Sequence, residues 1–454
     1  MTAVPVAVFD RTGLPDDLDI VLGEAELDLA SIDRSGALPS GRPWAQLRPQ
    51  SVAEVQSVVR WASERSIALI PRGAGSGLAG AALAGEGAVV LDLTRMDAIV
   101  EIRVDDQVAV VQPGVITAAL DAEARHHGLF YAPDPGSVGI STIGGNIATN
   151  AGGLRGAKYG VTRDAVLALD VVLADGRLVR LGRETVKGVA GYDLASLIVG
   201  SEGTLGIVVS ATLRLLPVPA AVSTAAVFLP SLAAAANAVL AIGRSGARPT
   251  VLEIVDRATL AAIDSLDGTD FASQGEAFLL VQTDGFGASL EMEHILSVVA
   301  PFATSIESTD DPDAAQTLLH ARRQALPAIE ALGRVLIEDI AVPRSRLADA
   351  IGGVHAIAER TGARIFVFAH AGDGNVHPII LLPPEGEGVA ELTAAEAIFA
   401  LALELGGTIA AEHGVGALKR DWAARELGRD VGELQLAVKA LFDPSGILNP
   451  GRAV

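Results

Sequence analysis

The stretch Pro71-Arg-Gly-Ala-Gly-Ser-Gly-Leu-Ala-Gly80 lies between two apolar runs that read as strands, 67–70 and 88–93. Its second half matches the glycine pattern of dinucleotide-binding folds, and Asp92 follows at the end of the second run. A parallel crossover, however, needs roughly a dozen or more residues, most of them helical. Only 81–87 remain after the last glycine, and Gly85 and Gly87 disfavour a helix there. We therefore predict a phosphate-cradling loop of bare backbone N–H groups instead of a Rossmann unit.

Further glycine-rich segments follow this loop, and we expect them also to expose bare backbone N–H groups to a ligand. Bare backbone and small polar side chains at such density suggest ordered loops wrapped around an extended ligand. The segments are Pro133-Asp-Pro-Gly-Ser137, Ser141-Thr-Ile-Gly-Gly-Asn146, Asn150-Ala-Gly-Gly153, Lys158-Tyr-Gly160 and Gly200-Ser-Glu-Gly-Thr-Leu-Gly-Ile207.

Two segments near the C-terminus carry three of the eight histidines, His370-Ala-Gly-Asp-Gly-Asn-Val-His377 and Glu412-His413-Gly-Val-Gly416. The first lies between apolar β-rich runs, and its Gly-Asp-Gly-Asn core predicts a hairpin with a histidine on each strand. Two imidazoles and a carboxylate are a ligand set for a divalent metal. Since neighbours in an extended segment point in opposite directions, we expect Glu412 and His413 to serve different partners.

The length of the chain predicts two domains or one large composite, because 454 residues exceed one ordinary core. Strand-like and helical runs alternate after Pro217-Val-Pro219, which predicts an α+β second domain. We expect a first domain over 1–217 with a helical N-terminal extension at 16–31, a second domain over 218–425, and a last segment over 426–454.

Composition narrows the partners and the location. A formal net charge of −21 argues against nucleic acid and against anionic membrane surfaces. The absence of cysteine excludes disulfides, thiolate chemistry and cysteine-bound zinc or iron–sulfur centres. No secretory signal or membrane-spanning segment is recognised, so a cytoplasmic protein is expected.

Together, in this order, the glycine-rich segments resemble the FAD-binding domain of the vanillyl-alcohol oxidase and p-cresol methylhydroxylase superfamily. The two histidine segments and Asp443-Pro-Ser-Gly-Ile-Leu-Asn-Pro-Gly451 narrow the resemblance to FAD-linked D-2-hydroxyacid dehydrogenases, of the D-lactate dehydrogenase and glycolate oxidase type. It covers residues 45–454. The implied fold is α+β: a two-subdomain FAD-binding domain and an α+β cap domain with an antiparallel sheet.

The resemblance implies which residues hold FAD. The segments 71–77 and 135–153 would bind the pyrophosphate and ribityl chain, and Asn449 would close over the flavin. No histidine lies in 71–80, so non-covalent FAD is expected. The implied contacts are Arg72, Gly73, Ala74, Gly75, Ser76, Gly77, Pro135, Gly136, Ser137, Thr142, Gly145, Asn146, Asn150, Gly152, Gly153, Glu202, Gly206, Ile207 and Asn449.

The resemblance also implies the substrate half of the site. His370, His377 and Glu412 would bind a divalent metal, zinc or manganese, and His413 would be the catalytic base. Arg322 would hold the substrate carboxylate, although Arg323 beside it is an alternative from the residues alone. Apolar Leu326 and Ile337 stand where members acting on long diacids carry polar groups, which favours a small or apolar substrate.

The leading hypothesis is therefore oxidation of a small D-2-hydroxy acid, of the D-lactate or glycolate type, to the 2-oxo acid. Electrons would pass to a quinone, a carrier flavoprotein, a cytochrome or oxygen, and a homodimer is one candidate assembly. An oxygen-using oxidase, a non-catalytic flavin subunit of a glycolate oxidase complex, and a flavin-free metallohydrolase are the alternatives. The last leaves the loops at 71–160 without a purpose.

Overall fold

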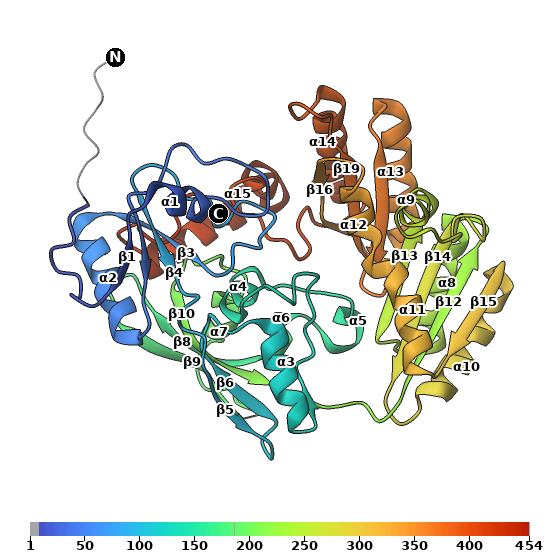
Figure 1. The fold of residues 1–454 in the computed structure, drawn as a ribbon, viewed down its shortest axis with the longest axis horizontal. Helices are drawn as coiled ribbons and strands as arrows, with labels where there is room; N and C mark the ends of the chain where they lie inside the picture. The colour runs from blue at the N-terminus through green and yellow to red at the C-terminus, as the bar shows by residue number, and fades with distance from the viewer. Residues whose placement is uncertain (1–8, 186, 454) are drawn as a thin grey trace.

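The computed structural model describes residues 9–185 and 187–453, so the extreme ends of the predicted first and last segments lie outside it. Figure 1 shows two bodies side by side, an N-terminal one in blue to green and a second one in yellow to orange. Helices and antiparallel sheets occur together in the chain, and the predicted α+β class is confirmed.

The N-terminal body begins with a four-stranded sheet in the order β1-β2-β4-β3. Helix α2 (Val52–Arg65) packs on it, and the Ser51 hydroxyl begins the helix by accepting the Glu54 N–H at 3.3 Å. The strands are β1 (Asp19–Val21), β2 (Ala45–Arg48), β3 (Ala68–Arg72) and β4 (Ala88–Asp92).

Two expectations for this sheet need correction. The loop 73–87 contains no helix, as predicted. Strands β3 and β4 nevertheless pair in parallel, so the argument that this connection is too short for a parallel crossover is wrong. The helix expected over 16–31 is confined to α1 (Glu24–Ala30), because β1 pairs with β2 at the sheet edge. Sheet pairing overrides the helical periodicity there.

A five-stranded antiparallel sheet completes this body, in the order β5-β6-β10-β8-β9. Its strands are β5 (Ile99–Arg103), β6 (Val108–Val111), β8 (Val166–Val172), β9 (Leu178–Gly182) and β10 (Ile207–Arg214). Helix α3 (Thr117–His126) packs against it. The glycine-rich segment after α3 folds into loops and short helices, α4 (Ile143–Thr149), α5 (Gly156–Tyr159) and α6 (Thr162–Ala165).

The second body is an eight-stranded antiparallel sheet with helices on both faces (Figure 1). The strands are β12 (Val222–Leu229), β13 (Val251–Asp256), β14 (Ala277–Asp284), β15 (Ser305–Thr309), β16 (Val335–Ile337), β17 (Ile340–Ala341), β18 (Ile365–His370) and β19 (Asn375–Leu381). One face packs on α8 (Leu232–Ser245), α10 (Ala288–Val299), α13 (Leu347–Thr361) and α14 (Val389–Glu404). The other packs on α9 (Arg257–Asp267), α11 (Pro312–Arg323) and α12 (Ala325–Glu330).

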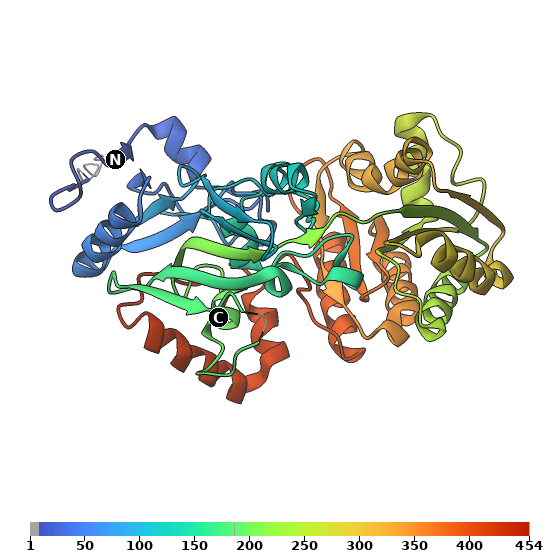
Figure 2. The same cartoon turned by 90° about the horizontal axis from the view of Figure 1, so that it is seen from below.

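The C-terminal segment returns to the N-terminal body (Figure 2). Helix α15 (Arg420–Phe442) is interrupted at Gly428, where φ is 69° and ψ is 174°. After it, the Leu69 N–H of β3 donates to Ile447 O at 2.8 Å, and the Asn449 N–H donates to Leu69 O at 2.8 Å. The last turn is thereby fixed beside the glycine loop that follows β3.

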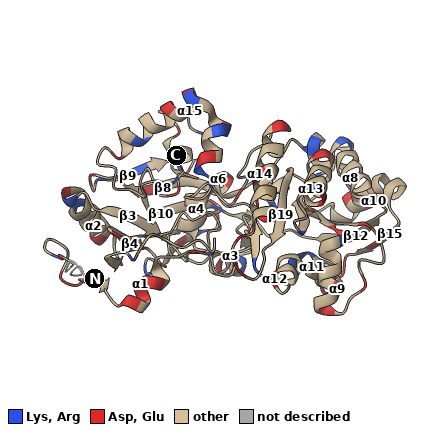
Figure 3. Ribbon diagram, turned by 90° about the horizontal axis from the view of Figure 1, so that it is seen from above, with Lys and Arg blue, Asp and Glu red and all other residues tan. Residues whose placement is uncertain are grey.

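Basic and acidic residues are both spread over the elements of the two bodies (Figure 3). Across 9–185 and 187–453, no helix has both the length and the apolar content required to cross a membrane.

Candidate functional site

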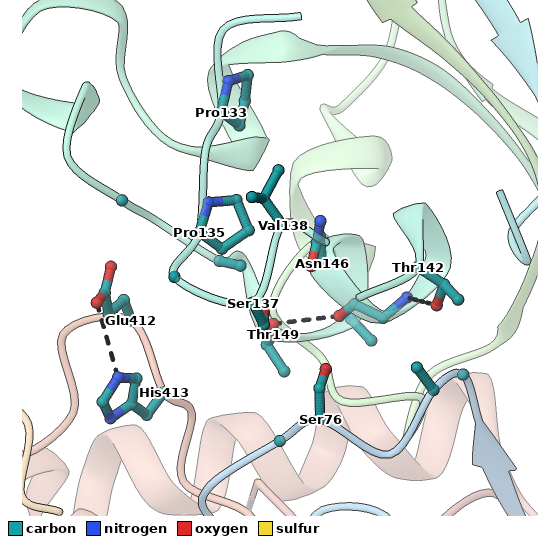
Figure 4. A pocket seen from close by; sticks show the side chains of 18 of the residues that line it. Ser76, Pro133, Pro135, Ser137, Val138, Thr142, Asn146, Thr149, Glu412 and His413 are labelled. Atoms are coloured by element: carbon teal, nitrogen blue, oxygen red, sulfur yellow. Dashed lines mark hydrogen bonds and ion pairs between the residues drawn. The ribbon is translucent and has the colours of Figure 1, made fainter. Parts of the chain in front are cut away.

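A cavity of about 880 Å³ is lined by residues of both bodies. Apart from Asn150, every residue predicted to contact cofactor, metal or substrate lines it. Figure 4 shows Glu412 and His413 on one side, with Ser137, Asn146 and Ser76 across from them. The predicted lining residues are Arg72, Gly73, Ala74, Gly75, Ser76, Gly77, Pro135, Gly136, Ser137, Thr142, Gly145, Asn146, Gly152, Gly153, Glu202, Gly206, Ile207, Arg322, His370, His377, Glu412, His413 and Asn449.

Asn150 is the exception, and its position has a local explanation. It ends α4 in the left-handed conformation at φ 56°, and its Oδ1 accepts the Arg163 N–H at 2.9 Å. Asparagine tolerates this conformation better than most residues. Asn150 therefore shapes the loop and does not line the cavity.

The glycines of the lining keep space open for an extended ligand. A Cβ added at Gly77 or at Gly136 would meet no protein atom within 4 Å. At Gly73, a Cβ would lie 2.3 Å from Thr142 Oγ1, so glycine is needed there for the two loops to approach. The cavity volume falls within the roughly 300–1,000 Å³ of cofactor pockets, so these residues fit a cofactor of the size of FAD.

Glu202 and Asn449, which line the cavity on the side of the N-terminal body, are linked to the histidine segments. The Glu202 carboxylate accepts the N–H groups of Val415 at 2.7 Å and of Gly416 at 2.8 Å. Asn449 Nδ2 donates to Glu202 O at 2.6 Å. The position of His413 is therefore tied to the wall of the predicted cofactor site.

The predicted histidine hairpin is confirmed. Strands β18 and β19 pair antiparallel, with His370 opposite Asn375 and Phe368 opposite His377. All four side chains stand on one face of the sheet, because alternate residues share a face. The ring centroids of His370 and His377 are 5.0 Å apart.

The expectation that Glu412 and His413 point in opposite directions is wrong. The segment around them bends, because the N–H groups of Ala411, Glu412 and His413 all donate to Asp339 Oδ2, at 2.9, 2.8 and 2.8 Å. Three successive N–H groups around one anion form a concave nest. Both side chains then turn to the same side, and Glu412 Oε1 lies 3.7 Å from His413 Nε2 (Figure 4).

Glu412 Oε1 is the centre of a cluster of imidazole nitrogens. It lies 3.5 Å from His370 Nε2 and 3.3 Å from His377 Nε2, and all three residues are largely buried. Atoms that bind one metal ion at about 2.0–2.2 Å are separated by about 3–4 Å from each other. The donor set His370, His377 and Glu412 thus fits a divalent metal, with His413 beside it.

A second group, Asp339 with the Nδ1 atoms of His377 and His413, is close enough for a metal but is less suited to one. Asp339 Oδ2 already accepts three N–H groups, and Oδ1 accepts Asn375 Nδ2 at 2.7 Å. The Nδ1 atoms lie 3.6 Å (His377) and 4.0 Å (His413) from this carboxylate. Asp339 therefore acts as an anion behind the imidazoles, whose Nε2 atoms lie near Glu412 Oε1 in the cavity.

The surroundings of His370 and His413 shift their pKa values in opposite directions. Burial opposes the charge on His370, but Glu253 and Glu412 outweigh it and raise the pKa of His370 well above its ordinary value. This position favours positive charge, which a metal cation also supplies. Burial lowers the pKa of His413, although Asp339 opposes the shift, so His413 is neutral at pH 7 and can accept a proton.

The Arg322 side chain lies on the face of the sheet that also carries Phe368 and His370. Its Nε donates to Glu253 at 2.8 Å, and its guanidinium lies 4.3 Å from the centre of the Phe368 ring. Arg323 also lines the cavity, but its Nη1 donates to exposed Gln316 at 2.7 Å. The buried and oriented guanidinium is that of Arg322.

Two carboxylates of this site, Glu253 and Asp339, were missed from the sequence. Glu253 is an acidic residue inside the apolar strand β13, a pattern that signals a buried partner without identifying it. Asp339 lies between two short strands and has no motif around it.

Comparison with known proteins agrees with this architecture. Residues 43–182 match the model described as "FAD binding domain", and residues 218–453 match "FAD linked oxidases, C-terminal domain". The chain is 41% identical to glycolate oxidase subunit GlcD of Bacillus subtilis, over 90% of this chain and 88% of that protein. It is 36% identical to a D-lactate dehydrogenase of Archaeoglobus fulgidus, over 90% of each chain.

Among solved structures, p-cresol methylhydroxylase with bound substrate superimposes with a TM-score of 0.80 at 18% identity, over 98% of this chain and 95% of that one. A 4-ethylphenol oxidase from Gulosibacter chungangensis gives a TM-score of 0.74 at 19% identity, over 96% and 94%. The chain therefore has the p-cresol methylhydroxylase type of flavoprotein fold and belongs to the FAD-linked oxidoreductase family that includes glycolate oxidase subunit GlcD and D-lactate dehydrogenase.

Proposed function

We propose that this protein is an FAD- and divalent-metal-dependent dehydrogenase that oxidises a small D-2-hydroxy acid, of the D-lactate or glycolate type, to the 2-oxo acid. The observation that carries the proposal is the convergence of three imidazoles on Glu412, in the cavity that the flavin-side loops also line. The names of the relatives, a glycolate oxidase subunit and a D-lactate dehydrogenase, support this substrate class.

Each residue of the substrate half has a proposed role. When bound, FAD supplies a two-electron acceptor for the substrate Cα–H, and the metal increases the acidity of the substrate hydroxyl. His370, His377 and Glu412 hold the metal. Neutral His413 accepts the hydroxyl proton at Nε2, and Arg322 binds the substrate carboxylate.

The apolar part of the wall supports a small substrate. Leu326 and Ile337 line the cavity together with Phe368, and none of the three offers a hydrogen bond to a second carboxylate. Burying an unpaired carboxylate against such a surface is costly. A long diacid is therefore a poor substrate in this proposal.

The remaining predictions complete the proposal. FAD is held non-covalently by the lining residues of 72–153 with Glu202, Gly206, Ile207 and Asn449. Residues 1–217 form the FAD-binding domain, 218–425 the cap, and 426–454 a segment that returns to the first domain. A cytoplasmic location and a separate electron acceptor also stay predictions.

Anaerobic titration of the bound flavin tests the function directly. We expect D-lactate or glycolate to bleach the flavin absorbance near its visible maximum, and L-lactate and D-2-hydroxyglutarate to do so much more slowly. Pretreatment with a chelator should prevent bleaching, and added zinc or manganese should restore it. A flavin that no 2-hydroxy acid reduces contradicts the proposal.

A non-catalytic role is the second candidate, because three of the relatives are named as subunits of a glycolate oxidase. Bleaching of the purified single chain excludes this candidate. Stoichiometric peroxide during aerobic turnover would instead identify an oxygen-using oxidase.

The glycines that line the cavity, such as Gly77 and Gly136, give an independent prediction about FAD affinity. In Gly136→Leu, the new side chain extends into the cavity and should weaken FAD binding by about 10- to 100-fold, the equivalent of roughly 1–3 kcal/mol of overpacking. Gly139→Leu is the matched control, because a Cβ there also meets no atom and Gly139 does not line the cavity. Quenching of FAD fluorescence on binding measures both, and equal affinities would contradict the placement of FAD at this loop.

A further inference from the structure

Glu253 is a buried carboxylate in β13 with a relative exposure of 1%. Strand β13 pairs with β18 in a register that places Glu253 opposite His370. Opposite residues of an antiparallel pair share one face of the sheet. Glu253 therefore stands beside the proposed substrate site, although it does not line the cavity.

Glu253 contacts both the proposed metal ligand His370 and the proposed substrate-binding residue Arg322. Its Oε1 and Oε2 lie 2.8 and 2.9 Å from His370 Nδ1. Its Oε2 also accepts the Nε–H of Arg322 at 2.8 Å. One carboxylate thus links a proposed metal ligand to the proposed substrate arginine.

The contact with Arg322 fixes how the guanidinium is presented. Glu253 takes the Nε edge, and Phe368 covers one face of the group at 4.3 Å. Among the hydrogen bonds of the described residues, Nη1 and Nη2 are left as the free donors, and these are the pair that a carboxylate binds. Holding this long side chain in advance reduces the entropy lost when an anion binds.

The contact with His370 fixes which nitrogen carries the proton. A carboxylate beside Nδ1 favours the Nδ1–H form, which leaves Nε2, 3.5 Å from Glu412 Oε1, as the nitrogen that would bind the proposed metal. Loss of such a partner typically costs about 10- to 100-fold in metal affinity.

We propose that Glu253 is a positioning residue that couples the two halves of the substrate site, by orienting His370 toward the metal and Arg322 toward the substrate carboxylate. This inference rests on the proposed function. It predicts that metal affinity and anion affinity both fall when this one carboxylate is altered.

The test is Glu253→Gln, which keeps the size of the side chain but replaces one acceptor oxygen with an N–H₂ group. The neutral amide removes the negative charge that both His370 Nδ1–H and Arg322 Nε–H face, so both contacts weaken whichever way the amide lies. We expect the Kd for Mn²⁺, measured by calorimetry on the metal-free FAD-bound protein, to rise about 10- to 100-fold. At saturating Mn²⁺, the Kd for oxalate, measured by perturbation of the flavin spectrum, should rise at least about tenfold, the loss of one charged hydrogen bond.

Two variants serve as controls. Asp256→Asn makes the same change on the same strand at a carboxylate that is 1% exposed and accepts the Thr259 N–H at 2.8 Å, away from the cavity. It should leave both affinities within about twofold. Arg322→Met should weaken oxalate binding and leave Mn²⁺ affinity within about twofold.

The outcomes separate this inference from the function itself. Wild-type affinities in Glu253→Gln, or a change in only one of the two, would overturn the coupling role. If Glu253→Gln does not fold, Glu253→Asp keeps the charge but withdraws it by one methylene, and the same two affinities decide. A wild-type protein that binds neither Mn²⁺ nor oxalate contradicts the proposed function instead.

Discussion

Replacing His413 with alanine is expected to slow reduction of the flavin by D-lactate or glycolate by about 10²- to 10⁴-fold, the usual contribution of a positioned general base. The imidazole lines the cavity beside Glu412, and burial lowers its pKa so that it is neutral at pH 7. Without it, no other neutral base adjoins the proposed metal ligands among the described residues, since His370 and His377 are themselves ligands. Anaerobic stopped-flow measurement of the absorbance decay gives the rate directly.

FAD content and Mn²⁺ affinity should change little in His413→Ala, because the loop backbone stays bound to Asp339 through its N–H groups. His320→Ala is a suitable control, because His320 lies on α11 in an exposed pair with Asp267, outside the cavity lining. A flavin reduction rate within about threefold of wild type in His413→Ala, at full metal and FAD content, would remove His413 from the role of base.

The glycine-rich loops that line the cavity were predictable from the sequence because the glycine motifs that specify them are local. Glycine is needed at 73, where two loops approach each other, and at 75, where φ is 69°, and such needs appear in the sequence as motifs. The hairpin of His370 and His377 was predictable for the same reason, since its turn and its strands are contiguous. The parallel pairing of β3 and β4 was not, because a long irregular connection carries no helical pattern to reveal it.

The roles of Glu253 and Asp339, which lie behind the histidines, could not be predicted from local sequence. Glu253 is separated from His370 by 117 positions, and Asp339 from His413 by 74. Glu253 meets His370 because strands distant in sequence become neighbours in the second sheet. Asp339 meets His413 because the loop after α14 returns to β17, where Thr408 bridges to Ala341. The motif indicates that the histidines act together, but the residues that orient them come from the topology.

The same topology explains why Glu412 and His413 point together. In an extended segment they would diverge, yet the Asp339 carboxylate gathers three consecutive N–H groups and bends the chain around itself. Burial would raise the pKa of Asp339, but His413, His377 and Lys419 outweigh it and lower the pKa to about 2. Asp339 therefore stays ionised at physiological pH and maintains this bend.

Replacing Glu412 with glutamine is expected to lower metal affinity by more than about 100-fold, beyond the usual effect of losing an outer partner. Glu412 Oε1 lies within 3.5 Å of Nε2 of both His370 and His377, so it is the one anionic donor in the proposed ligand set. Burial opposes its ionisation, but His370 and His377 hold the pKa of Glu412 well below its ordinary value. The neutral amide removes the negative charge that a divalent cation needs in this buried position.

Calorimetry with Mn²⁺ and Zn²⁺ on the FAD-bound protein measures this change, and elemental analysis of the purified protein gives an independent readout. The visible flavin spectrum should stay as in wild type, because Glu412 lies across the cavity from Ser76 and Asn146 of the predicted FAD contacts (Figure 4). Asp373→Asn is the control, since Asp373 lies in the turn between β18 and β19, outside the cavity lining.

Wild-type metal content in Glu412→Gln would show that the histidines are not part of a metal site centred on this carboxylate. Loss of metal together with loss of flavin reduction, restored in the wild type after chelation by added Mn²⁺ or Zn²⁺ but not in the variant, would establish that the metal activates the substrate while the flavin accepts its electrons.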